Sequence, residues 1–248
     1  MRATFFVDEP FAAGRPATLS ENEANHAHVR RLGVGEQVRV VDGRGAIGEG
    51  TLVRLAKSGG LIDVERVTAV EPPPAVHLMV PIADRDRMLW LAEKAAELGV
   101  SSWRPVIWKR SRSVTPRGEG VGFQAKVRAR MLAALTQSGG AWLPILYPDA
   151  TLDRALAAAP TGTRLLLDAA GDAIVMRTLA VPVTVALGPE GGVEDEERAS
   201  LVFAGFAPVS IAPTTLRFET AGVASLAIVR SALLAQSVPH TSPGIARA

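Results

Sequence analysis

The stretch "PVTVALGPEGGVEDEE", residues 182–197, contains the change of pattern that decides the fold of this chain. Six mostly apolar residues lead into Gly-Pro-Glu-Gly-Gly, and a run of acids follows. A short apolar run that stops at a glycine predicts a buried strand and a turn, and acids favour the N-terminus of a helix through its dipole. We therefore interpret the stretch as strand, loop and helix, with a bare backbone at the end of the strand that a ligand can approach closely.

Strands and helices alternate on both sides of this stretch. Apolar runs predict further strands at 76–83, 103–108, 163–169 and 207–212. Helical patterns lie at 84–99, 120–138, 151–158, 194–204 and 216–236. This alternation is typical of a mostly parallel sheet with helices on both faces. We predict an α/β domain over residues 75–248.

The segment "EPPP", residues 71–74, separates this domain from a different pattern. Consecutive prolines cannot continue a helix or a central strand, so they indicate a stiff linker. Before the linker, residues 36–41 and 60–70 alternate apolar with polar side chains, and a turn is expected at Asp42-Gly43. With a short helix over 21–32, these signals predict a small β-rich domain at residues 1–71.

Composition restricts the class of protein. The chain has 248 residues and no cysteine, which excludes disulfides and thiolate metal sites, and its four histidines are scattered. No apolar run is expected to reach the roughly 18–20 residues of a membrane span, and "MRATFFVDEP" lacks the pattern of a signal peptide. We expect a soluble, cytoplasmic protein with no metal and no membrane.

Basic residues are concentrated in one segment. Residues 104–130 carry 8 basic and 1 acidic side chains, whereas residues 1–71 carry 9 and 10. Arginine makes up 23 of the 27 basic residues, and its guanidinium contacts phosphate in a bidentate manner. The segment is consistent with nucleic-acid binding, and equally with a solvated basic loop.

The residues after the glycines indicate which ligand suits the loop. A phosphate-binding loop would continue with Lys-Ser or Lys-Thr, whereas four carboxylates, residues 194–197, would repel a triphosphate. The spacing also differs from the G-x-G-x-x-G dinucleotide pattern. A ligand with hydroxyls, an adenine ring and a cationic centre fits better, and the alternative is a tight turn without a ligand.

A second group of polar residues follows the strand at 207–212. In "APTTLRFETA", residues 212–221, Thr214 or Thr215 is expected to cap the next helix. Arg217, Glu219 and Thr220 are then expected in the first two turns of that helix.

These segments together resemble one family. "LGPEGGVEDEE" (187–197), "AGFAPVSIAPTTLRFETA" (204–221) and "AEKAAELGV" (92–100) resemble the ribosomal RNA small-subunit methyltransferase E family. Its members belong to the SPOUT class of knotted, S-adenosylmethionine-dependent methyltransferases. "HVRRLGVGEQVRVVDGRG" (28–45) is similar to the PUA-like RNA-binding domain of that family. The resemblance implies a trefoil knot, methylation at N3 of a uridine in 16S rRNA of the small ribosomal subunit, and a homodimer.

The resemblance also assigns roles to residues. Cofactor contacts are expected from the three loops after 163–169, 182–187 and 207–212, through Leu167, Gly188, Glu190, Gly192, Ile211, Leu216 and Thr220. Arg217 is the candidate to stabilise negative charge on the uracil or to hold the target phosphate, and Glu219 or Glu190 is a candidate base. A structural role is the alternative for Glu219. RNA contacts are expected from Arg30, Arg31, Arg110 and Arg112.

The chain departs from the family pattern in several places. Thr136 and Gly140 flank the "QSG" segment, Ala212 replaces a usual glycine, and Phe218 interrupts the usual "LRTETA". Three other functions remain open. One is a SPOUT enzyme that methylates a ribose 2′-hydroxyl. The others are a non-catalytic RNA-binding assembly factor and a hydrolase that uses Glu190 and Glu219 as paired carboxylates.

Overall fold

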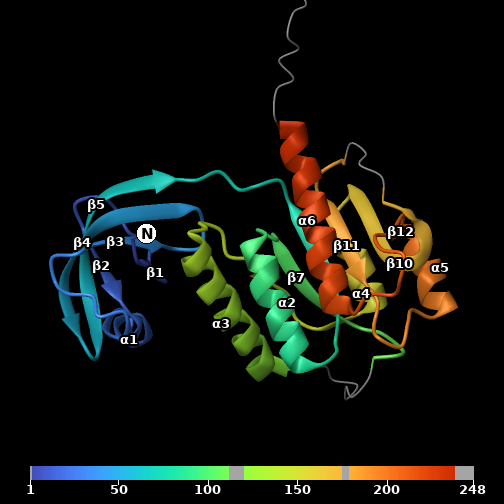
Figure 1. The fold of residues 1–248 in the computed structure, drawn as a ribbon, viewed down its shortest axis with the longest axis horizontal. Coiled ribbons are helices and arrows are strands. Elements are labelled where there is room, and N and C mark those ends of the chain that lie inside the picture. The colour runs from blue at the N-terminus through green and yellow to red at the C-terminus, as the bar shows by residue number, and fades with distance from the viewer. Residues whose placement is uncertain (1, 112–119, 175–178, 238–248) are drawn as a thin grey trace, which may run out of the picture.

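The computed structural model describes residues 2–111, 120–174 and 179–237, which form two β-sheets with their associated helices (Figure 1). The larger sheet has the strand order β12-β10-β11-β6-β7-β8, and β9 pairs with β7. Every pairing between its described strands is parallel. Its strands are β6 (Val76–Pro81), β7 (Ser102–Ile107), β8 (Ile145–Leu146), β9 (Ala150–Thr151), β10 (Thr163–Ala173), β11 (Val183–Leu187) and β12 (Ala207–Ser210).

Helices cover both faces of this sheet. On one face, α2 (Arg85–Glu97), α3 (Gly120–Ser138) and α6 (Phe218–Ser237) bury Leu91, Val127 and Val229 against the strands. On the other, α4 (Leu152–Ala157) and α5 (Asp195–Phe203) bury Ala155 and Leu201 in a second cluster. The predicted α/β fold is therefore confirmed. Helices are needed on both faces because the strands carry apolar side chains on both sides.

Local signals locate the ends of the early helices well. The Asp84 side chain accepts a hydrogen bond from the Arg87 backbone N–H at 3.0 Å and caps α2. Gly99 follows the end of α2 with φ +68°, a left-handed conformation that favours glycine. At the start of α5, Glu194 and Glu197 form a reciprocal capping box, which accounts for part of the acidic run.

The start of α6 differs from the prediction. The helix begins at Phe218, and the Ala221 N–H donates to the Arg217 carbonyl at 2.9 Å. Arg217 therefore precedes the helix, and the expected caps Thr214 and Thr215 lie in the irregular segment before it. The prediction that Arg217 lies inside the helix is wrong, so its direction does not follow from helical periodicity.

The smaller sheet has the strand order β1-β3-β4-β5-β2. Its elements are β1 (Thr4–Phe6), β2 (Pro16–Leu19), α1 (Glu21–Val29), β3 (Gln37–Val41), β4 (Ala46–Ala56) and β5 (Gly59–Ala69). The pairings are antiparallel except that between β1 and β3. The predicted turn is present, since Asp42 Oδ1 accepts hydrogen bonds from the N–H groups of Arg44 and Ala46.

Helix α3 joins the two parts of the molecule. Phe6 and Val41 of the smaller sheet pack with Leu135 of α3 in one buried cluster. The Arg128 guanidinium lies 5.5 Å from the centre of the Phe6 ring. In addition, the Trp142 indole N–H donates to the Val70 carbonyl at 2.9 Å. Figure 1 shows α3 between the smaller sheet and α2, so the two domains share a packed contact as well as a linker.

Helix α6 is strongly apolar. Residues Phe218–Gln236 are long and apolar enough to cross a membrane by length and composition, so the expectation that no segment reaches that level is wrong. In this fold, however, Leu226, Val229 and Leu233 of α6 lie in the core beside α2. A Cβ at Gly222 would lie 2.8 Å from Leu91 Cδ1, which shows how closely the two helices approach.

Candidate active site

The loops after β10, β11 and β12 meet around one cavity. These three strands are neighbours in the sheet, and their carboxyl ends lie at the same edge. The cavity has a volume of about 610 Å³, within the range of small-molecule sites. Its lining consists of Arg87, Leu167–Ala169, Leu187–Glu190, Gly192, Val193, Arg198, Val209–Ala212, Thr214–Phe218 and Ala221.

The glycines of the β11 loop serve different purposes. The Gly192 N–H donates to the Pro189 carbonyl at 2.9 Å, which closes a turn, and Gly192 adopts φ +81°. A Cβ at Gly192 would meet only Arg110 Nη1, at 3.9 Å, so conformation and not space requires glycine there. At Gly188 the requirement is space, because a Cβ would lie 2.7 Å from Val193 Cγ2.

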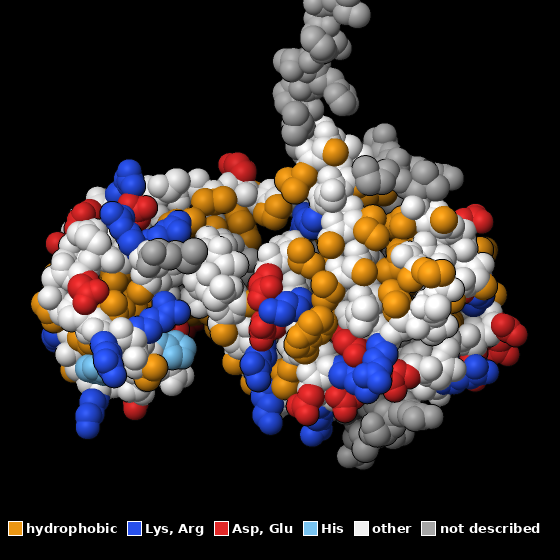
Figure 2. All heavy atoms as spheres, viewed as in Figure 1, with side chains coloured by type: hydrophobic (Ala, Val, Ile, Leu, Met, Phe, Trp, Pro, Cys, Tyr) orange, Lys and Arg blue, Asp and Glu red, His pale blue; other side chains and the backbone are white. Residues whose placement is uncertain are grey.

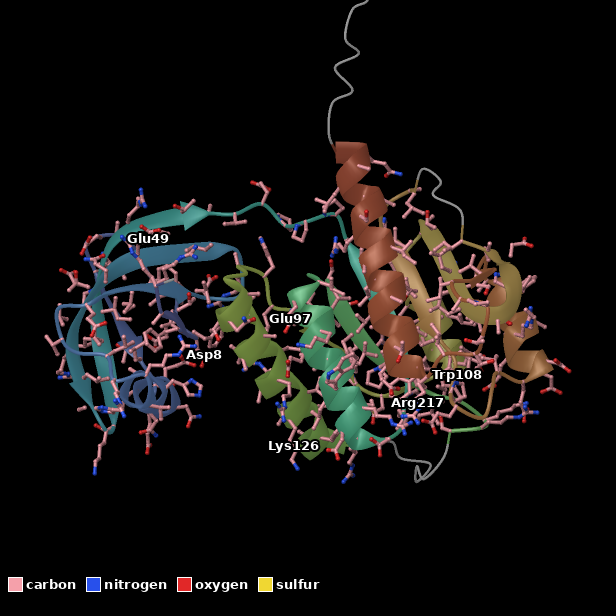
Figure 3. All side chains as sticks on the ribbon, viewed as in Figure 1. Asp8, Glu49, Glu97, Trp108, Lys126 and Arg217 are labelled. Atoms are coloured by element: carbon pink, nitrogen blue, oxygen red, sulfur yellow. The ribbon has the colours of Figure 1, made fainter. Side chains whose placement is uncertain are left out.

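The structure brings most of the predicted cofactor residues to this cavity. Those that line it are Leu167, Gly188, Glu190, Gly192, Ile211 and Leu216. Thr220 does not; it lies on the exposed side of α6. Of the two predicted catalytic residues, Arg217 lines the cavity and is exposed, whereas Glu219 is buried and is not part of the lining. Figure 3 shows Arg217 near the lower end of α6.

Charged side chains of both signs surround the cavity, and Figure 2 shows acidic and basic groups gathered near the first turn of α6. Arg198 donates to the carboxylate of Asp168, which lies at the end of the apolar part of β10. Arg87 donates to Glu190 and also lies 3.8 Å from a carboxylate oxygen of Glu219. Within the described parts of the chain, no carboxylate lies within 4.0 Å of the Arg217 guanidinium.

Reasoning from the sequence missed three of these residues: Arg87, Asp168 and Arg198. The positions of Arg87 and Asp168 in the sequence could have indicated that they belong to the site. Arg87 follows the carboxyl end of β6, and Asp168 follows the apolar run of β10, at the sheet edge where ligands of such folds bind. Arg198 had no comparable signal, because it belongs to the first turn of α5, and a local pattern does not show its pairing with Asp168.

The four arginines predicted to bind RNA occupy different surroundings. Arg30 and Arg31 are exposed at the C-terminal end of α1 in the smaller domain. Arg110 donates to the Gly191 carbonyl at 3.2 Å and to the Glu194 carboxylate at 3.4 Å, so it is attached to the glycine loop. Arg112 lies outside the described residues. Arg110 therefore contacts the glycine loop and the start of α5, and its RNA contact stays a prediction.

The acids at the start of α5 also face the end of β7. The Glu197 carboxylate accepts a hydrogen bond from the Lys109 N–H at 2.8 Å. A hydrogen bond with Glu196 raises the pKa of the Lys109 ammonium and lowers the pKa of the Glu196 carboxyl. The acidic residues 194–197 thus neutralise part of the basic segment 104–130. This pairing could not be predicted from the sequence, because the two segments are far apart in the chain.

Comparison with known proteins identifies the family of this fold and cavity. A family model described as an RNA methyltransferase domain matches residues 70–230, and one described as an RNA methyltransferase PUA domain matches residues 19–65. The chain belongs to the RNA methyltransferase family. The resemblance found in the sequence is therefore confirmed, for the α/β domain and for the smaller one.

Relatives match nearly the whole length of this chain, and two of them have known structures. Ribosomal RNA small subunit methyltransferase E of Mycobacterium bovis is 29% identical over 240 residues, covering 91% of this chain and 90% of that protein. The crystal structure of the same-named enzyme of Neisseria gonorrhoeae, bound to S-adenosyl methionine, matches with a TM-score of 0.84 and 26% identity over 93% of this chain and 98% of that chain. A putative methyltransferase of Legionella pneumophila, also with bound cofactor, matches with a TM-score of 0.85 and 26% identity over 94% and 98%.

Proposed function

We propose that this protein methylates N3 of a specific uridine in 16S rRNA, with S-adenosylmethionine as methyl donor. The observation that carries the proposal is the convergence of three strand-end loops on one cavity. The Neisseria relative of the same fold is bound to this cofactor. The small-subunit rRNA substrate is supported by the name shared by the curated relatives and by the PUA domain match.

The residues of the cavity fit such a cofactor. Leu167, Ile211 and Leu216 offer apolar side chains for an adenine ring, and the glycine loop offers close backbone approach. The carboxylates of Asp168 and Glu190 lie at the same cavity, where hydroxyls and a sulfonium cation would find acceptors and negative charge. When bound, S-adenosylmethionine supplies an electrophilic methyl group.

Arg217 is our candidate for the catalytic cation. Removal of the N3 proton spreads negative charge to O2 and O4 of the uracil, and a fixed donor nearby would stabilise it. Arg217 lines the cavity, is exposed, and has no described carboxylate partner. The target base would leave its stack to reach the site.

Glu219 fits a structural role better than that of a base. It is buried, does not line the cavity, and its carboxylate lies beside Arg87. The same geometry disfavours the hydrolase alternative, because Glu190 and Glu219 both face one arginine and do not flank an open substrate site. Glu190, which is partly exposed at the cavity, is the remaining candidate base among the predicted residues.

The experiment that tests this function has two parts. Calorimetry should show binding of S-adenosylmethionine and S-adenosylhomocysteine but not of ATP or NAD. Mass spectrometry of nucleosides from treated 16S rRNA should then show 3-methyluridine. A 2′-O-methylated nucleoside would instead identify the ribose-methylating alternative. Cofactor binding with no methylation of any rRNA preparation would overturn the proposed activity, and no cofactor binding would favour an RNA-binding assembly factor.

We also propose that residues 1–71 form an RNA-binding PUA-like domain and residues 75–248 the catalytic domain, with the trefoil knot that the family implies. The arginines exposed at the end of α1 support an RNA contact in the first. The placement of β10 between β11 and β12 supports the knotted arrangement in the second. A ribosomal substrate would locate the protein in the cytoplasm.

Arg30→Gln combined with Arg31→Gln is expected to weaken RNA binding and flatten its salt dependence. Each lost phosphate contact lowers the slope of log K against log salt by about 0.7 for single-stranded RNA, so the pair should lower it by about 1.4. Filter binding at several salt concentrations measures the slope. Arg154→Gln, an exposed arginine on α4, is the matched control. An unchanged slope in the double variant would remove these arginines from the RNA surface.

We further propose a homodimer that pairs through α6. The outward side of this helix carries no charge, and its residues are Thr220, Ala224, Ala227, Ile228, Ser231, Leu234 and Ala235. Small side chains permit close approach of a second helix, and Leu234 is 67% exposed. Figure 2 shows apolar side chains along α6 and over the strands beside it.

Leu234→Arg is therefore expected to shift the protein toward monomers, because it places a charge in an apolar contact. Sedimentation at micromolar concentration measures the change, with Ala235→Ser as a control on the same side of α6. A wild-type protein that sediments as an active monomer would overturn the dimer proposal.

A further inference from the structure

Arg87 lines the cavity but has no role in the methyl transfer proposed above. It is the third residue of α2, and the Asp84 cap holds its backbone N–H. Its side chain reaches across the rim of the cavity to two carboxylates from distant parts of the chain. One is Glu190 of the glycine loop after β11, and the other is Glu219 in the first turn of α6. Among the ion pairs printed for the described residues, those of Arg87 connect these three segments.

The burial of Glu219 makes its attraction to Arg87 important for the stability of this part of the fold. The side chain of Glu219 is 12% exposed and that of Arg87 33%, so water screens their attraction only in part. The second oxygen of Glu219, Oε2, is buried and has no hydrogen-bond partner among the described residues. A buried carboxylate with a single cation nearby is strongly destabilised when that cation is removed.

We propose that Arg87 is a positioning residue for the methyl-transfer site. It holds the glycine loop through Glu190 and the start of α6 through Glu219, and so fixes the distance between the two loops that would enclose the methyl donor. Arginine suits this task because its guanidinium contacts two carboxylates in a fixed geometry, which a lysine ammonium does not reproduce. The proposal rests on the proposed function, since it concerns the same cavity.

The test is a double-mutant cycle with two ligands. Arg87→Met, Glu190→Gln and the double variant are compared by calorimetry with S-adenosylhomocysteine and with 5′-methylthioadenosine, which lacks the amino-acid part. Arg87→Met is expected to raise both dissociation constants about tenfold and by the same factor. In the Glu190→Gln background it should add less than about threefold, because residues that act through one contact are not additive. Arg130→Met, which removes an exposed ion pair with Glu93, is the matched control and should bind both ligands normally.

Two outcomes would overturn the proposal. Loss of affinity for S-adenosylhomocysteine alone would mean that Arg87 contacts the amino-acid part of the ligand directly. A full tenfold loss that persists in the Glu190→Gln background would mean that it does not act through Glu190. If Arg87→Met fails to fold, Arg87→Lys should show an intermediate loss for both ligands, and normal affinity in that variant would also overturn the proposal.

A further readout separates this inference from the proposed function. Hydrogen exchange of the loop amides, including Gly192 N–H, should be faster in Arg87→Met than in wild type without any ligand. If wild-type protein does not bind the cofactor but this difference appears, the proposed function fails and the positioning role stands. Equal exchange in the two proteins would overturn the positioning role alone.

Discussion

Arg217→Ala should lower turnover about 10²–10³-fold and leave the affinity for S-adenosylhomocysteine nearly unchanged. The expected loss is large because Arg217 lines the cavity without a carboxylate partner in the described parts of the chain, so its charge is available to the reacting base or phosphate. Arg87 and Arg198 line the same cavity but are already paired with acids.

Single-turnover kinetics and calorimetry separate the two quantities. Arg217→Lys should recover part of the rate, because it restores the charge but not the planar donor geometry. Arg154→Ala, an exposed arginine on α4, is the control and should behave as wild type. A rise in the dissociation constant that matches the loss of rate would show instead that Arg217 binds the cofactor.

Gly192→Val should lower cofactor affinity about 5- to 150-fold. Gly192 has φ +81°, and forcing a β-branched residue into that conformation costs about 1–3 kcal/mol. Relief of this strain would displace the turn closed by the bond from Gly192 N–H to the Pro189 carbonyl, and with it the cavity wall. The sequence alone predicts that glycine is needed in this loop so that a ligand can approach the backbone closely. The structure gives a different reason, because a Cβ would meet only the Arg110 guanidinium, at 3.9 Å.

Gly192→Asn distinguishes these two reasons. Asparagine tolerates the left-handed region far better than valine, so this variant should retain most of the affinity. Calorimetry with S-adenosylhomocysteine measures both variants. Equal and large losses in Asn and Val would show that space, and not backbone conformation, requires the glycine. Normal binding by Gly192→Val would remove the loop from the cofactor site.

Most of the order of strands and helices in the larger domain could be predicted from the sequence, although β8 and β9, of two residues each, were missed. The strand at 182–187 and the helix at 120–138 follow from runs and periodicities of neighbouring residues, and β11 and α3 have nearly the same bounds. In the smaller domain β1, β2 and β4 were missed. β1 and β2 are only 3 and 4 residues long, and β4 (Ala46–Ala56) contains two glycines within its first five residues, which weakens the strand pattern.

Predictions that depended on the exact start of an element were less successful. α6 begins at Phe218 although its apolar periodicity extends to residue 216, because residues 211–217 instead form part of the cavity wall. As a result, Arg217 precedes the helix, Thr220 lies on the exposed side of α6, and Glu219 is buried. A local pattern cannot show this, since the other walls of the cavity come from the segments at the ends of β10 and β11.

The sequence by itself determined the α/β alternation, the linker at 71–74 and the three loops that follow strands, because these depend on residues close together in the chain. The tertiary structure alone decided that these loops meet, because β10 lies between β12 and β11 in an order that no local pattern encodes. It also decided which charges pair. Arg87 and Glu190 are 103 residues apart, and only the shared edge of a parallel sheet brings them together.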